Sequence, residues 1–330
     1  MTAGRVVTDE CDDQVAARLW GRLFPNRPID QARIDWQYRR GFCPGISPLI
    51  AIVEGSPVGH AGVIPVNVRG SAGDQTAIWF VDFALLSEWQ RRGVGGKLAA
   101  RWNQLGPLRL TTCNEKSMAL FAKQGWIRSG AVTRYALPLT RRALSKRSSL
   151  ATAVPAFALR SLARFRHRRN ANVRDVPATL VLRELEERFS GCEDDLIRDQ
   201  SWFRWRVAES PHRDEYRFAQ CGAAWALYRL LVTPAGIRRL HILYVSPADE
   251  DVVETRRVLD SILHAAIAAR TDLVWAVGSK ESVRRRFATI LPVHKEVLFA
   301  SHSDSVTEGT VDPRRLNIQG IDSDLDTAHF

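Results

Sequence analysis

Several features that would place this chain in a specialised class are absent from its sequence. The five cysteines are odd in number, dispersed and never spaced as CxxC, which predicts neither a disulfide framework nor a structural metal site. No apolar run approaches the roughly 18 residues of a membrane-spanning helix, and the start, MTAGRVVTDECDDQ, has no apolar signal core. These absences predict a reduced, cytoplasmic protein without a metal.

Acidic residues are missing from a long stretch in the middle of the chain. Between Glu115 and Asp175 there are fourteen Lys and Arg residues and no Asp or Glu, whereas the remainder has 33 basic and 36 acidic residues. The net charge of +11 therefore belongs to one region. Because that region has few interleaved aromatic residues and no recognition motif, the sequence does not predict specific binding of nucleic acid.

Residues 1–140 alternate between strand and helix patterns. Apolar residues at helical spacing follow Asp12 and end at Pro25, and alternating apolar residues flank the turn EGSP. We expect helices over 12–24 and 29–40, a hairpin over 48–70, a strand over 76–86, a helix from Val94, a strand over 108–113, a helix over 116–125 and a strand pair over 126–139.

Residues 141–176 are rich in Arg, Ser and Ala and are interpreted as a basic linker that is partly helical. One interpretation is a solvated linker. The other is an amphipathic helix, because Val154, Phe157, Leu162 and Phe165 fall near one helical face. Such a helix would make weak contact with an anionic surface or ligand.

The pattern of the first 140 residues returns in residues 177–330. A hairpin and strand pattern over 223–247 is followed by helix, strand, helix and strand patterns over 252–303. A local echo supports the repeat, since IDWQYRRGFCP and FRWRVAESP both place a Trp shortly before a Pro. The predicted fold class is α/β with an α+β mixed sheet: two similar units, each a mostly antiparallel sheet flanked by helices.

Three glycines fall within four residues of FALLSEWQRRGVGGKLAARW, residues 83–102. One explanation is a tight turn from strand to helix. The other is a phosphate cradle, since backbone N–H groups at a helix N-terminus bind anions where side chains are absent. The dinucleotide loop GxGxxG is not present, and GxxxxGK[ST] fails because Leu98 follows Lys97.

The segment QRRGVG, residues 90–95, resembles the Q/R-x-x-G-x-G/A motif of the GNAT superfamily of acyl-CoA-dependent N-acyltransferases. About twenty residues later, NEKSMALFAKQGW resembles the second motif of that superfamily. The resemblance covers residues 1–138. Residues 177–330 resemble the fold by element order only and have no glycine loop after LHILYVS. A W-R-x-x-x-x-P segment and GIDSD, which contains Asp322 and Asp324, resemble tandem acyltransferases associated with bacterial polysaccharide biosynthesis.

The resemblance implies a GNAT acyl-CoA-binding domain over 1–140, the linker over 141–176 and a degenerate GNAT-like domain over 177–330. Acetyl-CoA or another acyl-CoA would place its pyrophosphate on the glycine loop and its pantetheine arm along the preceding strand. The positions that match cofactor-binding residues are Phe83, Ala84, Leu85, Gln90, Arg91, Arg92, Gly93, Val94, Gly95, Gly96, Lys97, Asn114, Ser117 and Phe121.

Asp82 is the candidate general base, because it lies in an apolar strand where many members of the superfamily carry an acid. A structural Asp bonded to nearby backbone is the alternative, and His60, Glu54 and Glu115 are fallback bases.

The second motif often carries a Tyr that protonates the leaving thiolate. This chain has Phe121, which cannot donate a proton. Tyr135 or Cys113 is a candidate replacement.

The acceptor pocket is expected where the early helices meet the second unit. Its candidate residues are Trp36, Tyr38, Arg40, Trp205 and Arg206, because aromatic faces stack on sugar rings and Arg binds phosphates or carboxylates. Core packing is the competing explanation for the Trp residues. The predicted reaction is direct transfer to a small amine such as an amino sugar. A peptide- or protein-directed acyltransferase and a non-catalytic acyl-CoA scaffold are the alternatives.

Overall fold

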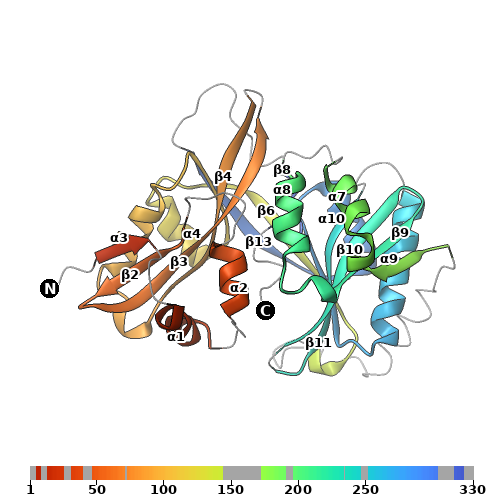
Figure 1. Ribbon diagram of the computed structural model, residues 1–330, viewed down its shortest axis with the longest axis horizontal. Coiled ribbons are helices and arrows are strands. Elements are labelled where there is room, and N and C mark those ends of the chain that lie inside the picture. The colour runs from red at the N-terminus through yellow and green to blue at the C-terminus, as the bar shows by residue number, and fades with distance from the viewer. Residues whose placement is uncertain are drawn as a thin grey trace.

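The computed structural model describes residues 5–8, 13–25, 31–39, 47–70, 73–143, 172–190, 196–233, 235–246, 252–303 and 316–322 (Figure 1). The predicted amphipathic helix around Phe157 lies outside these residues. Within the described part of the chain, no helix has the length and apolar character that crossing a membrane requires.

The N-terminal half follows the predicted order of elements. After the short strand β1 (Arg5–Thr8), it contains α1 (Asp13–Leu23), α2 (Gln31–Ile34), the π-helix η1 (Asp35–Arg39), β2 (Leu49–Val53), β3 (Ser56–Gly70), β4 (Gly73–Leu85), the 3-10 turn η2 (Ser87–Trp89), α3 (Val94–Trp102), β5 (Leu108–Cys113), α4 (Glu115–Ala122), β6 (Ile127–Pro138) and the 3-10 turn η3 (Arg141–Ala143). The hairpin and the helix after the glycine loop are confirmed. The predicted strand pair over 126–139 is wrong, because β6 is a single long strand.

The C-terminal half repeats this order. It contains β7 (Arg174–Pro177), η4 (Ala178–Val181), α7 (Leu182–Ser190), β8 (Leu196–Ile197), α8 (Gln200–Phe203), the π-helix η5 (Arg204–Ala208), η6 (Arg213–Glu215), β9 (Tyr216–Cys221), β10 (Ala224–Val232), β11 (Arg238–Ser246), α9 (Val252–Ala268), β12 (Leu273–Gly278), α10 (Glu281–Ile290) and β13 (Val293–Ser303). β7 uses the last residues of the predicted linker. The α8–η5 segment is the counterpart of α2–η1.

The strands of both halves form one continuous sheet, in which two strands cross from one half to the other. The order is β1-β2-β3-β4-β5-β13-β6-β12-β11-β10-β9-β7, and β8 pairs with β3. β13 therefore lies between β5 and β6, with Leu298 opposite Cys113, and β6 pairs with β12. Figure 1 shows β6 and β13 running through the middle of the molecule. The halves interlock through these two strands.

Each half contains one pair of parallel strands whose pairing ends early. β4 pairs with β5 as far as Phe80 and Thr111, and β11 pairs with β12 as far as Ile242 and Ala276. The strands continue past these pairs without pairing to each other. We call the unpaired ends, 81–85 with 112–113 and 243–246 with 277–278, the first fork and the second fork. A helix, α3 or α9, makes the crossover in each case.

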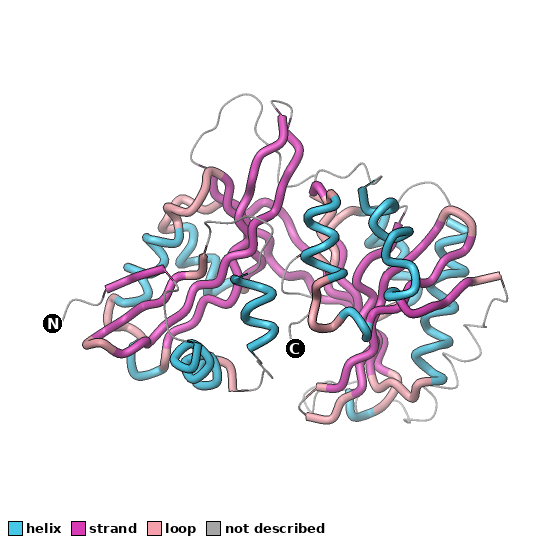
Figure 2. The backbone as a smooth tube through the Cα atoms, viewed as in Figure 1, coloured by secondary structure: helices cyan, strands magenta, loops and turns pink. Residues whose placement is uncertain are grey.

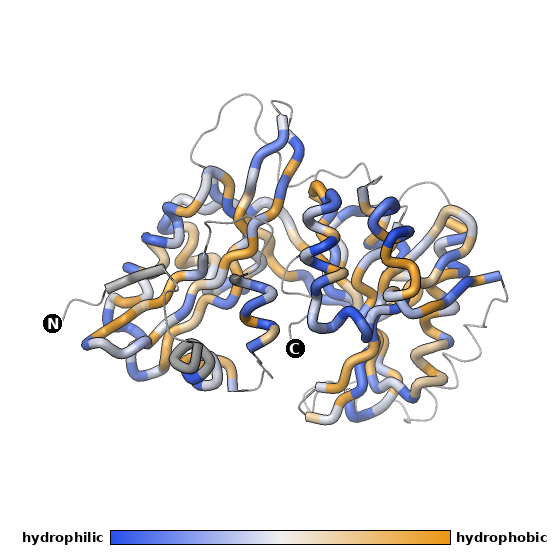
Figure 3. The backbone as a smooth tube through the Cα atoms, in the orientation of Figure 1, coloured by the Kyte–Doolittle hydropathy of each residue, from blue (hydrophilic) through white to orange (hydrophobic). Residues whose placement is uncertain are grey.

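Helices lie against the strands in both halves, and apolar residues are concentrated along the strands (Figures 2 and 3). One buried cluster packs α3 and α4 on the N-terminal strands, and a second packs α9 and α10 on the C-terminal strands. A third cluster, the junction core, draws on both halves. It includes Trp36, Tyr38, Trp79, Val81, Trp202, Trp205, Trp225, Trp275 and Phe299. The halves therefore share a core.

Candidate functional site

A β-bulge in β4 places Asp82 at the first fork. The register of β3 against β4 shifts between His60 and Gly62, so that Asp82 and Phe83 lie opposite one residue of β3. Asp82 adopts a left-handed φ of 50°, which is uncommon outside glycine, Asn and Asp. Such bulges re-aim a side chain. Here the side chain is turned toward Tyr38 in the junction core, on the face opposite to α3.

A chain of hydrogen bonds from η1 holds the Asp82 carboxylate. The Tyr38 hydroxyl donates to Oδ2 of Asp82 over 2.6 Å, and Nε2 of Gln37 donates to the Tyr38 oxygen over 3.0 Å. Nε of Arg33 donates in turn to Gln37 over 3.4 Å. A Cβ at Gly62 would lie 2.8 Å from the Tyr38 oxygen. Glycine at this position therefore makes room for the phenol beside the bulge.

His60 is buried beside Asp82 and is neutral at physiological pH. Its Nδ1 lies 3.1 Å from the Asp82 carbonyl oxygen, which can only accept, so Nδ1 carries the proton. Nε2 has no hydrogen-bond partner within the described residues. Burial lowers the pKa of His60 from 6.5 to about 4, against the opposing effects of the Asp82 carbonyl and charge. An imidazole with so low a pKa accepts a proton poorly.

The other fallback bases lie in exposed positions. Glu54 lies in the β2–β3 turn with a φ of 51°, and Glu115 lies in the first turn of α4. Of the predicted bases, the structure thus brings Asp82 and His60 together with Tyr38.

The glycine loop forms the N-terminus of α3. Gly93 is the N-cap, with a left-handed φ of 81° and no side-chain cap. The first N–H groups of a helix have no partner within the helix, so they are available to an anion. Arg91, Arg92 and Lys97 are exposed around them, with Arg92 5.1 Å from the Trp89 ring.

The three glycines of this loop have different explanations. Gly93 needs glycine for its positive φ, and a Cβ at Gly95 would lie 2.9 Å from Cδ1 of Leu85. Gly96 has neither constraint, because a Cβ there would meet nothing within 4 Å and its φ is ordinary. Glycine inside a helix costs about 0.5–1 kcal/mol relative to alanine. Neither backbone conformation nor packing therefore accounts for glycine at position 96.

The end of β4 connects the bulge with the loop. Phe83, Ala84 and Leu85 are half-buried, and the Phe83 ring stacks on Trp102 of α3 with centroids 5.2 Å apart. Nε2 of Gln90 donates to the Leu85 carbonyl over 3.2 Å. The predicted pantetheine strand and the predicted pyrophosphate loop are thus held to each other. Val94 is buried under the first turn of α3.

The second predicted motif builds the start and the inner face of α4. Oδ1 of Asn114 accepts from the N–H of Ser117 over 3.0 Å and caps the helix. Phe121 is buried, with its ring 5.0 Å from that of Trp126. These contacts give Asn114 and Phe121 a structural role, and their part in binding a cofactor stays a prediction.

The two candidate replacements for a general acid lie in different places. Tyr135 is buried in the C-terminal helix-covered core, 5.6 Å from the Phe287 ring, whereas Phe121 belongs to the core under α3 and α4. Cys113 shares the core of Phe121, but burial raises the pKa of its thiol to about 11. A thiol with a pKa of 11 is a weaker acid than an ordinary thiol of about 8.5, so protonating a thiolate from it is unfavourable.

Trp36 and Trp205 join the two π-helices by a reciprocal pair of hydrogen bonds. Nε1 of Trp36 donates to the Trp205 carbonyl over 2.6 Å, and Nε1 of Trp205 donates to the Trp36 carbonyl over 2.8 Å. The Arg206 guanidinium lies over both rings, and its Nε donates to the Ile321 carbonyl over 2.6 Å. All three side chains are buried, and their assignment to an acceptor pocket stays a prediction. Arg40 lies outside the described residues.

Part of the chain matches a known protein family. Residues 13–126 match the model of the Acetyltransferase (GNAT) family. No curated protein matches the chain in sequence.

Among solved structures, Saccharomyces cerevisiae N-myristoyltransferase with bound myristoyl-CoA is similar at a TM-score of 0.58 and 11% identity, covering 96% of this chain and 88% of that one. A GCN5-related N-acetyltransferase from Kribbella flavida is similar at 0.55 and 13%, covering 92% and 71%. One from Anabaena variabilis is similar at 0.53 and 11%, covering 92% and 74%. The mixed sheet flanked by helices, the family match and these structures together show that the chain has the GNAT acetyltransferase fold.

Proposed function

We propose that the chain is an acyl-CoA-dependent N-acyltransferase, with acetyl-CoA as the first candidate donor and a small amine such as an amino sugar as the acceptor. The observation that carries the proposal is Gly96, a helical glycine that neither backbone conformation nor packing requires. It lies in the first turn of α3, where the backbone N–H groups and three exposed basic side chains favour a pyrophosphate.

The first fork is the proposed place for the pantetheine arm. Beyond Phe80, β4 has no partner strand on the side of β5, so its main-chain groups are candidates for pairing with the amides of the arm. The arm would run from the loop toward the bulge at Asp82. Phe83 and Leu85 are the residues proposed to present these groups, and Asn114 and Ser117 would lie across the fork.

The thioester supplies an activated acyl group, and the chain supplies position and a proton acceptor. The amine nitrogen forms a bond to the carbonyl carbon, the carbon–sulfur bond breaks, and the sulfur leaves with the electron pair. Asp82 is proposed to take the amine proton, with its carboxylate oriented by Tyr38. Phe121 has no proton to give, so the thiolate takes its proton from water.

The acceptor is proposed to approach from the side of the junction core, because the Asp82 side chain is turned to that face. The proposed division is an acyl-CoA domain over 1–140 and a second GNAT-like unit over 177–330, which lies beyond the junction. A second candidate function is transfer of a longer acyl chain to a peptide amine. The fold similarity to the N-myristoyltransferase, which extends over 96% of this chain, is the reason to test it.

The decisive experiment compares two helical glycines that both have open space at Cβ. Gly96→Ala adds a methyl group to the proposed cradle, and Gly21→Ala adds one to α1. Both variants are expected to gain about 0.5–1 kcal/mol in unfolding free energy. Only Gly96→Ala is expected to weaken acetyl-CoA binding in calorimetry, by about 10- to 100-fold, because a displaced phosphate loses a charge-assisted hydrogen bond of roughly 1.5–3 kcal/mol.

Gly96→Glu, which adds bulk and negative charge, is expected to abolish that binding. The titration is repeated with myristoyl-CoA, and thiol release is then measured with amino sugars and with short peptides. If neither acyl-CoA binds the wild-type chain, or if Gly96→Ala binds as tightly as wild type, the cradle assignment is refuted.

A further inference from the structure

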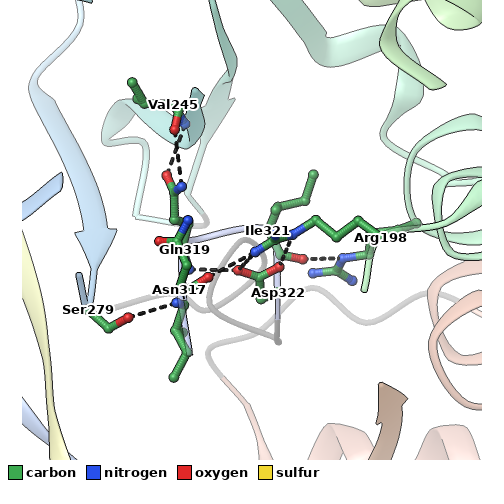
Figure 4. A network of polar contacts seen from close by, with 9 residues as sticks. Arg198, Val245, Ser279, Asn317, Gln319, Ile321 and Asp322 are labelled. Carbon is green, nitrogen blue, oxygen red and sulfur yellow. Dashed lines mark hydrogen bonds and ion pairs between the residues drawn. The ribbon is translucent and has the colours of Figure 1, made fainter. Parts of the chain in front are cut away.

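A short segment near the C-terminus is buried although it has no regular secondary structure. All seven residues 316–322 are buried, and they follow the last strand in sequence. A buried irregular segment must satisfy its backbone groups through specific partners. Figure 4 shows where those partners are: on β11, after β12 and on Arg198.

The segment lies in the second fork and contacts both of its strands. On the side of β11, Gln319 pairs its side-chain amide with the backbone of Val245: Oε1 accepts from the N–H over 2.9 Å, and Nε2 donates to the carbonyl over 3.2 Å. The N–H of Ile321 donates to the Leu243 carbonyl over 3.1 Å. On the side of β12, Gly278 forms a bridge with Gln319.

Ser279, directly after β12, continues these contacts. Its N–H donates to the Ile318 carbonyl over 3.0 Å, and its hydroxyl donates to the Leu316 carbonyl over 2.7 Å and accepts from the Ile318 N–H over 2.7 Å. A Cβ at Gly320 would lie 2.7 Å from Nε2 of His241 on β11. The segment therefore fills the fork with close backbone contact on both sides.

The two forks open at comparable points. The parallel pairing stops after Phe80 in β4 and after Ile242 in β11, and in each strand the register against its antiparallel neighbour shifts within three residues of that point. In the first fork, Phe83 is proposed to pair with an amide of the pantetheine arm. In the second, the amide that pairs with Val245 belongs to Gln319.

The residues at the start of α9 differ in charge from those at the start of α3. The sequence before α9 is PADED, and its first turn carries Glu254, whose carboxylate accepts from the N–H of Ala223 over 2.9 Å. At the corresponding position α3 has glycines and basic residues. A pyrophosphate at the first turn of α9 would meet the carboxylate of Glu254, so a CoA ligand does not fit this helix.

Two buried arginines, Arg198 and Arg206, donate hydrogen bonds to residues 316–322. Nε and Nη2 of Arg198 donate to the two carboxylate oxygens of Asp322, each over 2.9 Å, and both side chains are almost fully buried. Nη2 of Arg198 also reaches the Asn317 carbonyl, and Arg206 donates to the Ile321 carbonyl. Loss of one member of such a buried pair leaves an uncompensated charge. The segment is thus held by charge as well as by backbone pairing.

We infer that residues 316–322 are an intramolecular occupant of the second fork, where they take the place that the arm of acyl-CoA takes in the first. The chain accordingly binds one acyl-CoA, at the first fork only. The comparison with acyl-CoA rests on the proposed function, whereas the occupancy of the second fork by the segment does not.

The test uses the full chain and measures amide exchange of Val245 without any ligand. Gln319→Leu keeps the size of the side chain and removes its amide, so the Val245 N–H is expected to exchange at least tenfold faster than in wild type. Gln220→Leu is the matched control, since its Nε2 donates to the nearby Gly222 carbonyl on the exposed surface. Ser279→Ala is a milder second variant, with faster exchange expected at the Ile318 N–H.

Equal exchange in Gln319→Leu, Ser279→Ala and wild type would overturn the inference. Calorimetry with acetyl-CoA and myristoyl-CoA supplies the second readout, with one site per chain expected. Two sites per chain would also overturn it. Absence of any binding would refute the proposed function, and the exchange measurement would still decide whether the segment occupies the second fork.

Discussion

Acidification from neutral pH should lower the free energy of unfolding through protonation of His60. Replacing His60 should remove this contribution to the pH dependence. The imidazole is buried beside Asp82, and burial lowers its pKa in the folded chain from 6.5 to about 4. The unfolded chain therefore binds more protons than the folded chain between these two values. It follows that the stabilising contribution is present above about pH 6.5 and is lost as the pH falls toward 4.

The size of the effect follows from the two pKa values. With 6.5 for the unfolded chain and about 4 for the folded chain, His60 alone lowers the free energy of unfolding by about 2 kcal/mol between pH 7 and pH 5. His60→Asn keeps a donor for the Asp82 carbonyl but does not titrate in this range. The variant is expected to be less stable at pH 7, because a smaller side chain leaves a cavity, and to lose about 2 kcal/mol less than wild type on acidification.

Urea denaturation followed by tryptophan fluorescence at pH 7, 6 and 5 measures the free energy of unfolding at pH 7 and its loss on acidification, in wild type and variant. His294→Asn, on the exposed surface of β13, is the control for replacing a histidine on a strand. If wild type and His60→Asn lose the same free energy between pH 7 and pH 5, His60 is not held neutral by burial in solution. The neutral state of His60 beside Asp82 would then be wrong.

Two further predictions concern the contacts that connect the junction core with Asp82. Tyr38→Phe removes a hydrogen bond of about 1.5–3 kcal/mol to the Asp82 carboxylate, so kcat of acyl transfer should fall about 10- to 100-fold while acyl-CoA binding is unchanged. Tyr135→Phe is the control. An unchanged kcat in Tyr38→Phe would exclude a role of Tyr38 in orienting Asp82. Trp36→Phe and Trp205→Phe each remove one indole hydrogen bond and should each cost about 1–2 kcal/mol of unfolding free energy, with the double variant losing less than their sum. Strict additivity in urea denaturation would contradict the reciprocal pairing.

Features of the fold that depend on neighbours in sequence could be predicted. The hairpin over β2 and β3 follows from alternating apolar residues around a turn, and the helix after the glycine loop follows from Val94, Leu98 and Trp102 at helical spacing. The exchange of β6 and β13 could not be predicted, because both strands have the same pattern whichever half they pair with. The strand pair expected over 126–139 is instead the one strand β6, which continues through Gly130 without a turn.

The parts of the candidate site that could be predicted are those with an unusual residue type at their position in the sequence. Asp82 and the loop glycines could be singled out because an acid in an apolar strand and clustered glycines are locally unusual. Gln37, Arg33 and Gly62 were missed, since their role depends on η1 lying against the bulge of β4. The sequence shows a glycine at position 62 and a tyrosine at position 38. Their contact could be recognised only once β3 and η1 are placed side by side.

If the proposed function holds, one arrangement of strands serves two purposes within this chain. A parallel pair that stops pairing early leaves main-chain groups that need a partner, and two partners are available in principle: a bound molecule or another part of the chain. In the second fork the chain itself supplies the partner: the side-chain amide of Gln319 pairs with Val245, and the carboxylate of Asp322 pairs with Arg198. Next to the first fork, at the start of α3, the described residues supply instead open space at Gly96 and basic side chains around it. This difference, rather than the number of matching motif residues, is the strongest structural reason to place a ligand at the first fork.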